Sequence, residues 1–313
     1  MKPLARTLLA TVLAVAAACA PPIRRTIAQA PTPAQLAELW QEPKAISARE
    51  VTWGPWGRRL APDGSKPFRF VKRKTHGRSP GYHVVDAEGV EWSVKEGTEA
   101  GVEVAVSRIL SALGYRQPPV YYLPRWTLTG RRDAAKHQGP ARFRPKLPEI
   151  KERGDWSWQQ NPFVGTEPYG GLLALMLMLN ETDLKNSNNS LYEVTSADGR
   201  KHRWYVVRDL GSALGETGRM NPKGGDPELF ARLGFVTGVH DGRVAFAYHG
   251  LHQELAHQLT PADLHWMVRL ASRLSDEQWA EAFRAGGFSP QASNLYVRRI
   301  NEKMAQARSV SAR

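Results

Sequence analysis

Two short polar segments carry the residue types that metal-dependent chemistry needs. In residues 183–188 (DLKNSN), Asp183 is followed five positions later by Asn188, and residues 209–211 (DLG) begin with a second acid, Asp209. An aspartate and an asparagine on one tight loop can direct a base and a metal ligand into one site, and Mg²⁺ prefers oxygen ligands. Phosphoryl transfer needs little more: a cation on the donor phosphates, bridging metal ions, and a carboxylate that orients the attacking hydroxyl. The two segments therefore predict a phosphoryl-transfer site.

A buried helix and a hairpin must position these two segments. Residues 172–179 are apolar on every side, which predicts a helix in the middle of a lobe. Residues 191–194 and 202–207 flank an Asp-Gly turn, which predicts a β-hairpin. Because the hairpin returns the chain to where it started, we expect Asp209 to lie beside residues 183–188.

An earlier group of elements ends on a lysine. Three strands are expected to form an antiparallel meander that finishes at Lys95. A helix is predicted over residues 98–114, and Glu103 borders its buried face. Residues 131–154 are basic, contain prolines and lack periodicity, so we interpret them as a loop. The three strands are expected over residues 68–72, 82–85 and 90–95.

With these elements in order, the chain resembles protein kinases. Residues 183–188 resemble the kinase catalytic loop (DLKxxN), residues 209–211 resemble the DFG segment, and the meander ending at Lys95 resembles the small lobe. The resemblance implies an α+β, two-lobed kinase-like fold, with a small antiparallel-sheet N-lobe and a mainly helical C-lobe. A second resemblance, to uncharacterised bacterial exported proteins with a DLKxxNN motif, brings no established activity. It rests on the segments WSVKEG, EVAVSRIL, ALGY, NPFVGTE and DLKNSNN.

The kinase resemblance implies roles for the polar loop. Asp183 would orient or deprotonate the acceptor hydroxyl, and Lys185 would neutralise charge on the transferring group. Asn188 and Asp209 would hold Mg²⁺. One departure lies next to this loop: the kinase His-Arg pair is replaced by Glu-Thr at residues 181–182.

The resemblance also implies an ATP site. Lys95 would pair with the donor phosphates and Glu103 would fix the lysine. Gly77 and Gly81 are all that remains of the kinase glycine loop, which departs from the GxGxxG pattern. Leu210 stands where kinases have the phenylalanine of DFG.

The N-terminus has the pattern of an export signal. Lys2 and Arg6 precede apolar residues 8–18, and Cys19, the only cysteine of the chain, follows. Residues 16–19 (AAAC) resemble a bacterial lipobox, which predicts lipidation of Cys19 and a membrane anchor. The alanine after the cysteine resembles the outer-membrane sorting class, facing the periplasm. The alternative is an ordinary secreted protein whose cysteine lies in the discarded peptide.

The composition limits the partners. The chain carries 43 Lys and Arg against 30 Asp and Glu, a net charge of +13, with the densest basic patch over residues 58–74. A solvated basic surface explains this, and so does attraction to phosphates, anionic lipid or an acidic polymer. No zinc-finger, RNP-like or recognition-helix pattern is present, so no specific nucleic acid is expected.

These observations leave two classes of function. One is an exported phosphotransferase that acts with Mg²⁺ and ATP on the hydroxyl of an unknown protein, lipid or sugar. The other is a catalytically inactive kinase-fold lipoprotein that serves as an envelope scaffold. The predicted organisation is a signal peptide (1–18), a lipidated tether (19–66), an N-lobe (67–125), a connector (126–162) and a helical C-lobe (163–313).

Overall fold

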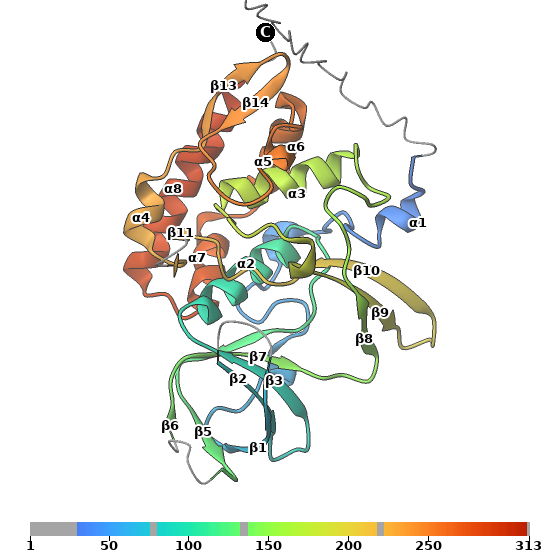
Figure 1. Ribbon diagram of the computed structural model, residues 1–313, viewed down its shortest axis with the longest axis vertical. Coiled ribbons are helices and arrows are strands. Elements are labelled where there is room, and N and C mark those ends of the chain that lie inside the picture. Colours follow the sequence, from blue (N-terminus) through green and yellow to red (C-terminus); the bar gives the residue numbers. More distant parts are fainter. Residues whose placement is uncertain (1–29, 76–79, 132–136, 218–221, 312–313) are drawn as a thin grey trace, which may run out of the picture.

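The computed structural model describes residues 30–75, 80–131, 137–217 and 222–311. Over these residues the chain forms a sheet lobe and a mainly helical lobe, each with its own apolar cluster, so the expected α+β, two-lobed fold is confirmed (Figure 1). The predicted signal peptide, Cys19 and Gly77 lie outside the described residues. In the part of the chain that is described, no helix has both the length and the apolar character needed to cross a bilayer.

The sheet lobe contains seven strands in the order β4-β7-β3-β2-β1-β5-β6. The predicted meander is present, and every neighbouring pair is antiparallel except β1 and β5, which are parallel. The strands are β1 (Pro67–Arg73), β2 (Gly81–Val85), β3 (Glu91–Glu96), β4 (Tyr121–Leu123), β5 (Trp126–Thr129), β6 (His137–Gln138) and β7 (Ala141–Pro145).

The sheet has one apolar and one polar face because side chains alternate along each strand. On β3, Trp92 and Val94 point into the apolar cluster of this lobe, and Ser93 and Lys95 point to the opposite side. The apolar cluster also contains aromatic side chains from neighbouring strands, namely Phe68, Tyr82, Tyr121, Trp126 and Phe143. The opposite face is left to line the site described below.

The interpretation of residues 131–154 as a loop, within the expected connector, is wrong. Strand β7 lies between β3 and β4, and β8 (Ile150–Gly154) pairs with the hairpin of the helical lobe. In β7, Phe143 points into the core while Arg142 and Arg144 point the other way. The two arginines made this segment look like a basic loop in the sequence. A strand with guanidinium groups on its buried side is stable only where a carboxylate compensates their charge.

The helical lobe is built around α3 (Glu167–Met178), which is buried on all sides as predicted. Thr166 caps its first turn by accepting from Tyr169 N, and α6 packs along it. The hairpin after α3 is confirmed and the C-lobe is mainly helical as expected, whereas the hairpin of β13 and β14 was not foreseen. The elements are β9 (Asn189–Thr195), β10 (Lys201–Val207), β11 (Glu216–Thr217), β12 (Pro222–Lys223), α4 (Pro227–Arg232), β13 (Val236–His240), β14 (Arg243–Phe246), α5 (Gln253–Ala256), α6 (Pro261–Ala271), α7 (Asp276–Ala285) and α8 (Pro290–Arg308).

Helix α2 (Glu99–Ala112) joins the two lobes. It follows β3 directly, as predicted, yet its apolar side chains belong to the core of the helical lobe. Gly101 packs against Gly286 after α7, and a Cβ at either glycine would lie 2.2 Å from the carbonyl oxygen of the other. Because no larger residue fits this contact, α2 is held at a fixed depth against the helical lobe.

Residues 30–66 do not form the expected tether. After the short α1 (Pro33–Leu36), the chain runs along the helical lobe, and Leu39, Ile46 and Val51 are buried in its core. The Arg49 side chain donates to Ser111 O at the end of α2 at 2.9 Å. The Pro- and Ala-rich composition suggested a linker, but a few scattered apolar residues are enough to bury an irregular segment.

Lys303 ties α8 to the end of α3. Its side chain is fully buried, its Nζ donates to Met178 O at 2.8 Å, and the same atom lies 4.0 Å from the ring centre of Phe230. Burial, with repulsion from Arg299, lowers the pKa of Lys303 to about 7. Below that pH the folded protein must hold a buried charge that the unfolded chain exposes to water.

We expect Lys303→Met to change the pH dependence of stability. The lysine binds a proton in the unfolded chain up to its ordinary value of 10.5 but loses it near pH 7 when folded, so wild-type stability rises between these values. The variant should gain stability over wild type at pH 6, and this advantage should shrink by pH 9. Urea unfolding at both pH values measures it, with the exposed Lys151→Met as control. A difference that does not vary with pH would contradict the assignment.

Candidate functional site

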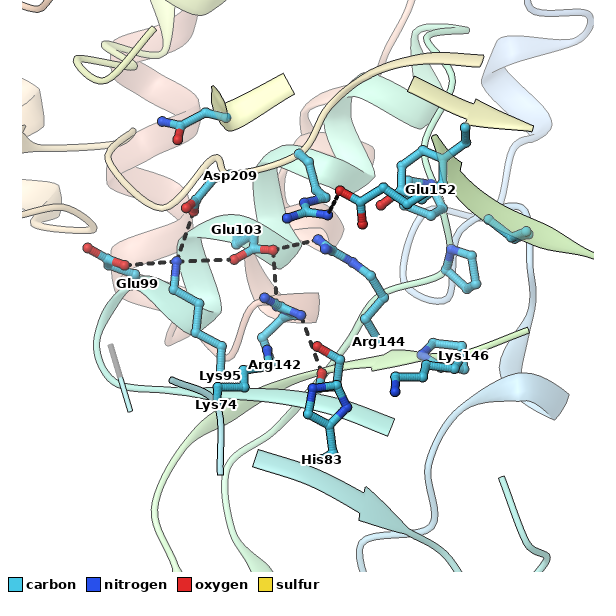
Figure 2. A pocket seen from close by; sticks show the side chains of 18 of the residues that line it. Lys74, His83, Lys95, Glu99, Glu103, Arg142, Arg144, Lys146, Glu152 and Asp209 are labelled. Carbon is cyan, nitrogen blue, oxygen red and sulfur yellow. Dashed lines mark hydrogen bonds and ion pairs between the residues drawn. The ribbon is translucent and has the colours of Figure 1, made fainter. Parts of the chain in front are cut away.

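The predicted site residues meet in a cleft between the two lobes, with a volume of about 1250 Å³. One wall is the polar face of the sheet, which lies in the lower part of Figure 1, and the opposite wall is the loop before β9 together with the segment after β10 (Figures 1 and 2). Six of the residues predicted from the sequence line it: Lys95, Glu103, Asp183, Lys185, Asn188 and Asp209.

Asn188 connects the two acidic segments. Its side-chain amide donates to Asp183 O at 2.7 Å and to Asp183 Oδ2 at 3.1 Å. Its main-chain oxygen accepts from Asp209 N at 3.1 Å. The hairpin of β9 and β10, paired from Asn189 with Val207 outward, brings Asp209 back to this position. One residue thus fixes both aspartates, and Asp209 lies beside residues 183–188.

Lys185 is paired within the loop. Its Nζ lies 2.8 Å from Asp183 Oδ1, and its side chain is half exposed to the cleft. A cation here neutralises Asp183 in the absence of ligand. The same cation can face an anionic group placed above the loop.

Lys95 is the central cation of the cleft. Its Nζ lies 2.8 Å from Asp209 Oδ1, 2.9 Å from Glu99 Oε2 and 3.5 Å from Glu103 Oε2 (Figure 2). Burial opposes its charge, but Glu103, Asp209 and Glu99 outweigh burial and raise the pKa of Lys95 above its ordinary value. The lysine is therefore charged throughout the physiological range. Glu99, one helical turn before Glu103, is a third partner that was not predicted from the sequence.

Glu103 is a buried carboxylate among three cations. Only 2% of its side chain is exposed, and Oε1 lies 3.0 Å from Arg142 Nε and 2.7 Å from an Arg144 guanidinium nitrogen. Burial favours the neutral acid, but Arg142, Lys95 and Arg144 outweigh it and lower the pKa of Glu103 to about 2. Sequence reasoning missed both arginines. The alternation of Arg142, Phe143 and Arg144 was the signal that could have found them.

The DLG segment packs closely against α2. Leu210 is buried in the helical core, which anchors the segment. A Cβ at Gly211 would lie 2.7 Å from Glu99 Cβ, so only glycine fits beside that glutamate. This contact sets Asp209 next to Lys95.

Glu181 stands where kinases carry a histidine. Its side chain is buried, and Oε1 accepts from Asp183 N at 2.9 Å. Burial raises the pKa of Glu181 well above its ordinary value, and the nearby Asp209 and Asp183 add to the effect. By accepting this hydrogen bond, the buried glutamate fixes the main chain of the loop at Asp183 and so positions its side chain.

Gly81 does not line the cleft. It begins β2 opposite Lys95, and its main-chain oxygen accepts from Lys74 N at 2.9 Å. A Cβ at Gly81 would lie 2.8 Å from Lys74 Cδ and 2.7 Å from Val94 O. This glycine makes room for the stem of Lys74. Gly77, its predicted companion in phosphate binding, lies outside the described residues.

The donor set fits a hard divalent ion. Asn188 uses its amide nitrogen on Asp183, and Asp209 uses Oδ1 on Lys95, so Asn188 Oδ1 and Asp209 Oδ2 have no partner among the described residues. Both are oxygen ligands of the kind that Mg²⁺ takes together with waters and phosphates. No group of three or more His, Cys, Asp or Glu side chains suited to a metal is found in the described part of the chain. Any ion here would need ligands from substrate or water.

No protein-family model and no curated protein matches this chain. Two solved kinase structures show a distant likeness. The proinflammatory kinase CtkA of Helicobacter pylori has 10% identity and a TM-score of 0.46, over 78% of this chain and 92% of that one. The Golgi casein kinase with Mn/ADP bound has 9% identity and a TM-score of 0.38, over 77% of this chain and 72% of that one. Likenesses this distant transfer no activity.

We expect Glu103→Gln to destabilise the protein strongly. The change removes the charge that compensates Lys95, Arg142 and Arg144, and loss of one partner from a buried ion cluster costs about 3–5 kcal/mol. Urea unfolding at pH 7 measures the loss. The matched control is Glu99→Gln, one helical turn earlier, where the glutamate is more exposed and Lys95 keeps two carboxylate partners. In this variant the loss should be about 1 kcal/mol or below, as for an ion pair at the protein surface. Equal losses in the two variants would show that Glu103 does not hold the cluster together.

Proposed function

We propose that this protein is a kinase-like phosphotransferase that uses Mg·ATP to phosphorylate a hydroxyl group. The supporting observation is the double attachment of Asn188, which holds Asp183 and Asp209 in one cleft opposite Lys95. A base, two metal-ligating oxygens and a phosphate-binding cation are the groups that phosphoryl transfer requires.

Each residue has a separate role in the proposed reaction. Lys95 holds donor phosphate, and Glu103 and Glu99 hold Lys95. Asp183 accepts a hydrogen bond from the acceptor hydroxyl and takes its proton as the new P–O bond forms and the bond to the ADP oxygen breaks. Lys185, beside Asp183, offsets charge on the group in transfer. Bound Mg²⁺ would supply further neutralisation of phosphate charge at Asn188 and Asp209.

The Lys95–Asp209 ion pair is compatible with this role. At 2.8 Å the two side chains neutralise each other without ligand. A ligand that brings both phosphate and a divalent ion offers a new partner to each. The ion pair therefore stabilises the charged site in the absence of a ligand that carries both phosphate and a divalent ion.

A second candidate is an inactive kinase-fold protein that binds an envelope partner. One observation favours it: the space at Gly81, where a glycine loop would expose its main chain to phosphates, holds the stem of Lys74. In that case the cleft would bind ligand without transferring phosphate.

Calorimetry and turnover separate the two candidates. We expect wild type to bind Mg·ATP and Asp209→Ala to lose binding, because that variant removes a metal ligand and leaves Lys95 without one of its partners. Asp183→Ala should keep binding but lose at least about a hundredfold in ATP turnover, the usual scale for a general base. Arg298→Gln, an exposed change on α8, is the control. Binding with equal, negligible turnover in wild type and Asp183→Ala would favour the inactive protein, and absence of binding in wild type would refute the ATP site.

We also propose that the protein is an outer-membrane lipoprotein facing the periplasm, anchored at Cys19. The support is the sequence pattern around residues 16–19. In a bacterial host, radioactive palmitate should label the wild-type protein, and Cys19→Ala should abolish the label and release the protein from membranes. A labelled variant, or an unlabelled wild type, would contradict the anchor.

A further inference from the structure

The cleft-facing side of the sheet carries several cations on neighbouring strands. Strand register places Gly81, Lys95 and Arg142 side by side on β2, β3 and β7, and the main chain of Lys74 bonds to Gly81 from the β1 side. A second row, two residues along each strand, consists of Lys72, His83, Ser93 and Arg144. Neighbouring strands lie about 4.8 Å apart and the two rows roughly 7 Å apart. The basic surface is therefore as wide as several linked phosphate groups.

The carboxylates nearby do not balance these cations. Glu103 is shared by Lys95, Arg142 and Arg144. No carboxylate of the described residues lies within ion-pair distance of Lys74. Burial and the charges of Arg142 and Arg144 lower the pKa of Lys74 to about 7. An additional anion would relieve this repulsion.

The ion pair with Glu103 leaves donors of Arg144 unused. Among the described residues its guanidinium makes one hydrogen bond, to Glu103 Oε1 at 2.7 Å, and its side chain is 15% exposed at the cleft. Figure 2 shows Arg144 beside the labelled Arg142 and Glu103, in the wall of the cleft. Guanidinium groups match the oxygens of phosphate in a bidentate manner. The donors of Arg144 that Glu103 does not use can therefore bind an oxyanion from the cleft.

We propose that Lys74, Arg142 and Arg144 form an oligophosphate-binding surface that continues from Lys95 and takes the place of a glycine loop. Main-chain N–H groups cover phosphates in a glycine loop. Here Gly81 instead admits the Lys74 stem, so side-chain cations do that work. The ligand class is a linear chain of phosphate groups, whether inorganic or part of a nucleotide. This inference rests on the proposed function in placing donor phosphate at Lys95.

Inorganic tripolyphosphate without Mg²⁺ is the direct probe. Calorimetry should show that it binds wild type, and that Lys74→Met and Arg144→Gln each weaken binding by at least about tenfold, the scale of one lost charge-assisted contact. Arg298→Gln should bind like wild type. Mg·ATP titrations of the same variants tell the sources apart: a matching loss shows that nucleotide phosphates use this surface, whereas a loss for tripolyphosphate alone assigns it to inorganic oligophosphate.

Lys74→Met separates a binding role of this lysine from a structural role, because the two roles predict different changes in stability. The variant removes a repelling charge that has no ion pair, so its melting temperature without ligand should equal or exceed that of wild type while its tripolyphosphate affinity falls. If Arg144→Gln fails to fold, this variant alone decides the question. Tripolyphosphate binding that is absent in wild type, or unchanged in Lys74→Met, would overturn the surface.

Different results would contradict the phosphate-binding surface and the proposed phosphotransferase. Loss of ATP turnover in Asp183→Ala together with unaltered tripolyphosphate and ATP affinity in Lys74→Met would leave the phosphotransferase standing without this surface. Tripolyphosphate binding that depends on Lys74, in a wild-type protein that turns over no ATP, would establish the surface without the enzyme.

Discussion

Glu103 is a carboxylate buried between the lobes, and three cations from two strands converge on it. Lys95 comes from β3, and Arg142 and Arg144 come from β7. None of these charges could be buried alone, because the desolvation cost of an unpaired ion amounts to several kcal/mol. Together they allow a sheet with a charged face to close over the cleft. The position of β7, the orientation of Lys95 and the shape of the sheet wall of the cleft all depend on this cluster.

The charges can pair in this way only because α2, which carries Glu103, is held in a fixed position. The contact of Gly101 with Gly286 fixes the depth of the helix two residues before Glu103. The C-terminal elements are secured in a similar manner, since Lys303 binds the last turn of α3, from which the chain leads to Asp183. Each wall of the cleft thus rests on a buried contact in the helical lobe. A site for charged ligands needs such support, because its own like charges repel.

The cleft places acidic and basic groups opposite one another. Asp183, Asn188 and Asp209 lie together on one wall, and Lys95 contacts Asp209 from the other. Among the described residues, the sheet wall offers guanidinium and ammonium groups to a ligand. Side-chain cations attract phosphate over a longer range than amides do, at the cost of greater repulsion without ligand. A net charge of +13 concentrated in part around this cleft would favour anionic ligands generally.

Much of the site could be predicted from the sequence because its parts are local. Asp183 and Asn188 are joined by one short loop, and a hairpin of near-ideal register returns Asp209 to it. The buried helix, the meander and the helix that carries Glu103 were also recognisable, since their periodicity is a local property of the chain. Local spacing was enough because these side chains are positioned by the segment that carries them.

Other features were decided only by the tertiary structure. Arg142 and Arg144 looked like solvated loop residues, and they became part of a buried strand because Glu103, some forty positions earlier, supplies the compensating charge. Residues 39–51 looked like a linker, but their few apolar side chains are buried in the core of the helical lobe. In both cases the deciding free energy comes from a partner distant in sequence. The sequence therefore determined which candidate residues meet in the cleft, whereas the packing of the two lobes determined the charged wall that surrounds them.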